Sequence, residues 1–200
     1  ELKKINYDYK NPPSITLKVV ANLNEPEKTI ANINFYGEDI SRKGSSYQIN
    51  ELDIESEYEN GNLVFKKIDV QDRFGELKGN AQWNMDDSTF PFNFKSSIDI
   101  TELTKLFTNS KLLDDLLFID PPQITAAGNL KFKNTEGNTR PFIKLFGSIE
   151  CNRMVLKDTL FESGATNFSY NDSKLYLRNL SLEHESGTLS GSYLQNELKE

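Results

Sequence analysis

Apolar and polar residues alternate along most of the chain. Residues 14–23 place Ile15, Leu17 and Val19 on one side at period two. Successive side chains of a β-strand point to opposite faces, so this pattern predicts a strand with one apolar face. Comparable alternation marks residues 29–36, 47–58, 63–70, 77–83, 90–94, 124–132, 142–149, 168–170 and 175–182.

Short turn signals separate these segments. Asn60-Gly61 is the strongest, because both residue types tolerate the positive φ angles of a two-residue type I′ hairpin turn. Pro12-Pro13 precedes the first strand, and Asp86-Asp87-Ser88 marks another turn. Strands joined by such short connections favour a meandering, mainly antiparallel sheet. We therefore predict an all-β fold with a curved, taco-like sheet or groove.

One segment departs from this alternation. In residues 99–118, Leu103, Leu106 and Phe107 stand at i, i+3 and i+4, which is the period of a helix. Asn109-Ser110 divides the segment into two parts. We expect one short helical insert here, between two groups of strands.

The chain also repeats itself. Gly75-x-Leu77-x-Gly79 returns as Gly187-x-Leu189-x-Gly191, at an offset of 112 (187 − 75). Pro12-Pro13 returns as Pro121-Pro122 at an offset of 109, and Tyr36-Gly37 is matched to Phe146-Gly147 at an offset of 110. The repeat predicts two β units, residues 1–120 including the helical insert and residues 121–200, within one continuous sheet.

Two arrangements of such a sheet remain open. The apolar face packs on a second sheet and forms a sandwich core, or it curls into a trough that meets a ligand. Periodicity is the same in both cases, because it fixes only which residues share a face.

Composition excludes several functions. The net charge of −7 argues against a nucleic-acid partner, which requires a basic surface. No apolar run approaches the roughly 18 residues that a membrane-spanning helix needs. Cys151 is the one cysteine and cannot form an internal disulfide, so we expect it to be a small buried apolar residue.

Candidate catalytic groups are few. His184 is the one histidine, and its alternating strand context predicts a solvated partner of the neighbouring glutamates. Asp86-Asp87 belongs to a turn, and Asp114-Asp115 to the polar side of the helical insert. The glycines of the repeated motif lack the following helix and Lys-Ser/Thr of a phosphate loop. We predict no enzyme activity, no cofactor and no metal site.

The repeated motif resembles a known superfamily. The frame Phe65-x-x-Ile68-x-Val70, followed by Gly75-x-Leu77-x-Gly79 and repeated towards the C-terminus, is similar to the β-strand units of AsmA-like proteins. That group includes the TamB and YhdP types of bacterial envelope protein. Asn60-Gly61 before the frame adds to the similarity, which covers about residues 15–193.

The resemblance implies a long β groove with an apolar inner surface that binds or conducts phospholipid between membranes, in outer-membrane biogenesis or homeostasis. It implies a periplasmic location, an inner-membrane anchor outside residues 1–200, and envelope proteins as further partners. The chain begins without Met and ends just past a strand-like segment, so we expect it to be an excised piece of a longer protein. Two units alone are too short to bridge a periplasm.

Acyl chains are then expected along alternating apolar residues of the strands. The predicted lining residues are Leu17, Val19, Phe35, Ile54, Phe65, Leu77, Phe92, Phe132, Leu145, Leu177 and Leu189. The alternative function is a non-enzymatic structural or interaction module, a closed β-sandwich of a larger surface protein.

Overall fold

The chain folds as a series of antiparallel β-strands. A computed structural model describes residues 5–21, 24–25, 28–42, 47–98, 116–135, 138–171 and 174–196. The strands are β1 (Ile5–Asn6), β2 (Ser14–Val20), β3 (Ile30–Arg42), β4 (Gln48–Glu59), β5 (Asn62–Asp72), β6 (Glu76–Asn84), β7 (Thr89–Ser96), β8 (Leu116–Phe118), β9 (Gln123–Thr135), β10 (Asn138–Cys151), β11 (Met154–Leu156), β12 (Thr159–Phe161), β13 (Ser163–Asn171), β14 (Lys174–His184) and β15 (Gly187–Asn196).

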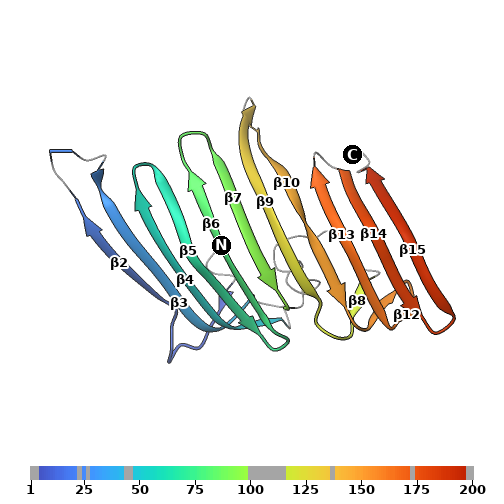
Figure 1. The fold of residues 1–200 in the computed structure, drawn as a ribbon. Helices are drawn as coiled ribbons and strands as arrows, with labels where there is room; N and C mark the ends of the chain where they lie inside the picture. The colour runs from blue at the N-terminus through green and yellow to red at the C-terminus, as the bar shows by residue number, and fades with distance from the viewer. Residues whose placement is uncertain are drawn as a thin grey trace.

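Most of these strands belong to one large sheet. Its order is β1-β3-β4-β5-β6-β7-β9-β10-β13-β14-β15, and β2 pairs with β3 beside β1. Neighbouring strands are antiparallel throughout, and the sheet stays open between β2 and β15 (Figure 1). A second sheet of three short strands has the order β12-β11-β8. The predicted all-β, mainly antiparallel fold of meandering strands is confirmed, and both predicted units contribute to the large sheet.

Two irregularities keep the apolar side chains on one face. In β5 the pairing shifts between Phe65 and Ile68, and in β14 it shifts between Leu177 and Leu180. Two residues three positions apart in a regular strand point to opposite faces. The bulge accommodates the extra residue, so both side chains of each pair lie on the same face. The two bulges are related by the offset of 112 that the glycine motif shows, so the structure repeats the same device in both units.

Residues at equivalent positions of the two units have equivalent cross-strand partners. Ser56 faces Phe65 in the first unit, as Phe168 faces Leu177 in the second, which is again an offset of 112. Strands β2 to β6 therefore correspond to β9, β10, β13, β14 and β15.

One alignment made from the sequence is wrong. Gly147 lies opposite Phe168, and the residue opposite the equivalent Ser56 is Ile33. The structural offset between β3 and β10 is therefore 114, so Phe146-Gly147 is not the spatial counterpart of Tyr36-Gly37. A shift of four residues keeps every side chain on its face, which is why alternation alone could not detect it.

The predicted helical insert is only partly tested. Residues 99–115 lie outside the described residues. The last three residues of the predicted segment, Leu116–Phe118, form strand β8, so the helix prediction is wrong there. Leu116 and Phe118 pair with β11 and pack on the apolar cluster under the small sheet. Their tertiary partners determine an extended conformation despite the helical spacing of the leucines.

The Asn60-Gly61 turn forms as predicted. Asn60 has φ 49° and Gly61 has φ 75°, the left-handed values that a type I′ turn requires. The Met85 amide donates to the Gly61 carbonyl oxygen at 3.1 Å, which links this hairpin to the next one.

We expect Gly61→Val to lower the free energy of unfolding by about 1–3 kcal/mol, because a β-branched residue at positive φ is strained. Urea unfolding followed by circular dichroism measures the loss. The matched variant Asn60→Gly, which tolerates the same φ, should change stability by less than about 1 kcal/mol. Equal losses in both variants would contradict this account of the turn.

Candidate functional site: an open apolar face

The candidate site is one face of the large sheet, called the apolar face below. Residues directly opposite in an antiparallel pair share a face, so the pairing can be followed from strand to strand. It places all eleven predicted lining residues on the same face. The cross-strand pairs that support this assignment are Leu17–Ile33, Phe35–Ile54, Ile54–Ile68, Phe65–Ala81, Val70–Leu77, Ala81–Phe92, Phe92–Gly128, Gly128–Leu145, Leu145–Tyr170, Phe168–Leu177, Leu177–Tyr193 and Leu182–Leu189. Val19 and Phe132 join through the period-two alternation of β2 and β9.

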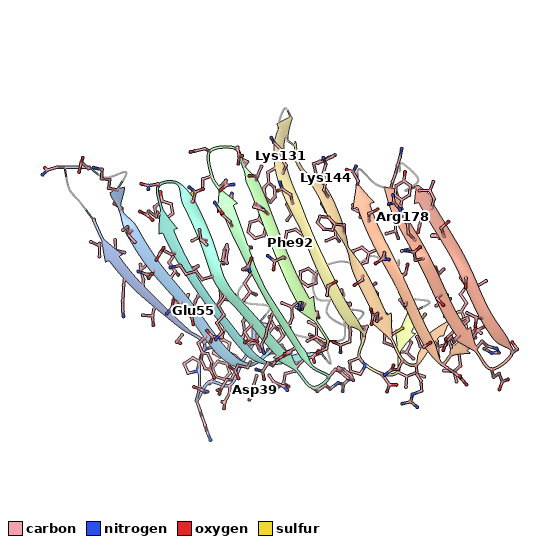
Figure 2. The ribbon with its side chains drawn as sticks, in the orientation of Figure 1. Asp39, Glu55, Phe92, Lys131, Lys144 and Arg178 are labelled. Carbon is pink, nitrogen blue, oxygen red and sulfur yellow. The ribbon has the colours of Figure 1, made fainter. Side chains whose placement is uncertain are left out.

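Charged side chains are absent from the middle of this face. Among the described side chains between the strand ends, the apolar face contains no Asp, Glu, Lys or Arg, and its polar members are residues such as Ser56 and Thr166. Ser56 donates to the Ile33 carbonyl oxygen at 2.9 Å, which satisfies its hydroxyl within the sheet. The opposite face, called the polar face, has charged residues such as Glu55 and Lys144 (Figure 2).

The apolar face is exposed at both edges of the sheet and half-buried between them, as at Phe92 and Leu145. Leu17 is 59% exposed and Leu189 is 58% exposed, at opposite edges of the sheet. The chain has 13849 Å² of accessible surface, compared with about 9,600 Å² expected for a compact monomer of 22.9 kDa. The described residues form no second large sheet over this face. The sandwich arrangement is therefore not what the described strands adopt.

Aromatic rings form the centre of the apolar face. The rings of Phe92 and Phe94 on β7 stack with centroids 6.2 Å apart, and Phe90 contacts both Phe92 and Phe65 at 6.3 and 6.0 Å. A Cβ at Gly128 would lie 2.9 Å from Cζ of Phe92, so glycine leaves room for that ring to lie across the neighbouring strand. The result is a smooth apolar floor.

The small sheet covers one end of the apolar face in the second unit, where it packs on β10 and β14. Cys151, Met154 and Leu182 form its buried cluster, with partly buried residues from β8, β11, β12 and β14 around them. Burial raises the pKa of the Cys151 thiol, which fits a packed and unreactive side chain. The prediction that Cys151 is a buried apolar residue is confirmed.

An ion pair fixes the connections of the small sheet. The Arg153 guanidinium donates to both carboxylate oxygens of Asp120, at 2.8 and 2.9 Å. These hydrogen bonds hold the pKa of Asp120 below its usual value. The pair joins the connection after β8 to the connection before β11.

Further buried residues lie at the same end of the strands in the first unit. Tyr47 is buried, and its hydroxyl donates to Oδ2 of Asp72 at 2.8 Å. Oδ1 of Asp72 accepts from the amides of Phe74 and Gly75 at 2.7 and 2.8 Å. The repeated glycine motif thus begins with an Asp-centred turn between β5 and β6, and its role is structural.

The buried residues Tyr47 and Met154 were not singled out from the sequence. Each lies near a strand end or in a short connection, where alternation carries little information. Their only sequence signal is that they are large apolar residues beside turn segments, and Tyr47 and Met154 have partners such as Asp72 and Leu182 in distant parts of the chain.

The candidate catalytic residues are not brought together. Nδ1 of His184 lies 2.8 Å from the hydroxyl of Ser186, and its ring packs edge-on against Phe161. The predicted partners were the neighbouring glutamates, and the contacts that the described residues show are to Ser186 and Phe161 instead. Asp87 accepts from the amide and hydroxyl of Thr89, which lowers its pKa and stabilises the turn. Asp114-Asp115 lies outside the described residues.

Within the described part of the chain, no group of three His, Cys, Asp or Glu side chains is placed to hold a metal ion. In the same residues, no helix has the length and apolar character needed to cross a membrane.

We expect Leu182→Ala to destabilise the fold by about 2–4 kcal/mol, because it removes a side chain that is 5% exposed from the capped cluster. Its cross-strand partner Leu189 provides the matched control, since Leu189→Ala removes the same atoms from an uncovered position. That variant should cost less than about 1 kcal/mol. Chemical denaturation of the two variants measures the difference, and similar losses would show that the face near β15 is covered.

Comparison of the chain with protein-family models, curated proteins and solved structures found no match.

Proposed function

We propose that this chain is a lipid-handling segment whose apolar face holds the acyl chains of phospholipid. The observation that supports the proposal most is the combination of a charge-free apolar face with its exposure over a single-layer sheet. Soluble monomers rarely leave more than a few hundred Å² of contiguous apolar surface uncovered, and larger patches mark binding surfaces.

The dimensions of the face suit an extended ligand. Eleven strand positions at a spacing of about 4.8 Å give a width of about 50 Å. An acyl chain lying across the strands would contact one side chain of each strand in turn. Burial of a methylene group contributes about 0.8 kcal/mol, so such a surface binds chains without a specific polar anchor.

The phenylalanines of β7 and their neighbours provide the apolar floor, and the small sheet covers one end of the apolar face in the second unit. We place the protein between the inner and outer membranes of a bacterial envelope, with a membrane anchor outside this chain and envelope proteins as further partners. The proposed role is to bind or conduct phospholipid between these membranes, without catalysis.

Photo-crosslinking from neighbouring residues tests the proposal. Benzoylphenylalanine at position 92 or 145 points to the apolar face, and at position 93 or 144 to the polar face. The purified chain is incubated with phosphatidylethanolamine, irradiated and analysed by mass spectrometry. We expect acyl-chain adducts at Phe92 and Leu145, because the apolar face holds the lipid.

The replacements at Asn93 and Lys144 are matched controls, since each lies one residue from a test position on the same strand. Equal labelling of the two faces would contradict the proposal. So would a complete lack of adducts together with no lipid co-purifying in native mass spectrometry, which would favour the interaction-module alternative.

A further inference from the structure

The polar face contains an open depression in the second unit. It measures about 400 Å³ and lies across β9, β10, β13 and β14. Its lining residues are Thr125, Phe146, Gly147, Ser148, Asn167, Phe168, Ser169 and Arg178. Arg178 is the one charged residue among them, and Figure 2 labels it on β14.

At the equivalent position of the first unit, the cation forms an ion pair with a carboxylate of the same chain. Lys66 corresponds to Arg178 by the offset of 112 between the two bulges. The Lys66 ammonium lies 2.7 Å from Oε2 of Glu57. Lys67 is likewise paired, with Asp53 at 2.5 Å and with Glu55 at 4.0 Å. The bulge of β5 therefore presents its two cations to carboxylates of the neighbouring strand β4.

The second unit keeps a cation and loses the carboxylates. Glu57 corresponds to Ser169, and Glu55 corresponds to Asn167, by the same offset of 112 that cross-strand pairing gives for β4 and β13. Among the residues that the structure describes, Arg178 has no ion-pair partner, and its guanidinium lies 6.0 Å from the ring of Tyr176. Glu57 and Glu55 are thus replaced by neutral side chains able to donate a hydrogen bond, and Asp53 is replaced by Ala165.

The backbone that carries Arg178 is held in place. The Thr166 hydroxyl donates to the Arg178 carbonyl oxygen at 3.2 Å, and Asn179 completes the bulge with φ 53°. The hydroxyls of Thr125 and Ser148 are hydrogen-bonded to each other at 2.8 Å on the adjacent strands. Phe146, 60% exposed, adds an apolar wall.

We propose that this depression is an oxoanion-binding site, in which Arg178 binds a phosphate or carboxylate group supplied from outside the chain. The planar guanidinium matches the paired oxygens of such groups, and hydrogen bonds to charged groups are the stronger ones. The amide of Asn167 and the hydroxyl of Ser169 add donors where the first unit has carboxylates. The site lies on the face opposite the proposed acyl-chain floor and does not depend on it.

Phosphate titration tests this site. Inorganic phosphate is added to isotope-labelled chain, and the NMR signals of the Asn167 side-chain amide and the Arg178 guanidinium are followed at constant ionic strength. We expect saturable shifts at both groups. Arg178→Gln should weaken binding about tenfold or more, because it removes the charge-assisted hydrogen bonds.

Two further variants separate binding from folding. Ser169→Glu restores the carboxylate that Lys66 has in the first unit, so it should abolish phosphate binding and leave the thermal midpoint unchanged or raised. Lys66→Gln is the matched control and should leave phosphate binding unchanged. A lack of saturable shifts, or shifts that survive both Arg178→Gln and Ser169→Glu, would overturn the proposal.

Binding to lipid vesicles distinguishes a phospholipid headgroup from a soluble oxoanion as the ligand. If the chain floats with phosphatidylglycerol vesicles more than with phosphatidylcholine vesicles, and Arg178→Gln reduces this flotation, the ligand is a phospholipid headgroup. Phosphate binding without Arg178-dependent flotation would identify a soluble oxoanion. Crosslinking from Phe92 is measured separately, so failure of either proposal is distinguishable from failure of the other.

Discussion

The structure depends on lateral backbone hydrogen bonding between long antiparallel strands. Strands such as β3, β4, β9 and β10 extend over 12 to 14 residues and pair along most of their length. Backbone donors and acceptors inside the sheet are therefore satisfied without a second layer. Apolar side chains gain what burial they have from neighbours on adjacent strands. This arrangement stabilises an extended sheet and leaves one of its faces open.

The same constraint explains the bulges. A sheet with one apolar face requires every strand to keep its apolar residues in phase, and an odd spacing such as Phe65 to Ile68 breaks that phase. A bulge in β5 and its counterpart in β14 restore it, at equivalent positions of the two units. Lys66 and Arg178 directly follow Phe65 and Leu177, so they lie on the polar face at the start of each bulge, beside the neighbouring strand. One local irregularity thus shapes both faces of the sheet.

The two units share a backbone plan and differ in side-chain chemistry. On the polar face of the first unit, acidic residues of β4 neutralise the lysines of β5. On that of the second unit, neutral residues surround Arg178. On the apolar face, the second unit is capped by the small sheet through Met154 and Leu182, and the floor between the units is formed by the phenylalanines of β7. Duplication therefore supplies a common sheet on which each unit carries its own surface.

The sequence by itself determined the strands, the division of their side chains between two faces, the Asn60-Gly61 turn and the duplication. These features are local, because a period of two and a turn are written in neighbouring residues. The sequence also named the residues of the apolar face, from Leu17 to Leu189, since a shift by two or four residues keeps each side chain on its face. The tertiary structure decided what lies over that face. Leu116–Phe118 form a strand of the small sheet, and β10 aligns with β3 four residues away from the sequence alignment. Arg178 lies in a depression whose lining residues include no carboxylate. Each of these depends on contacts between segments far apart in the chain, which alternation does not encode.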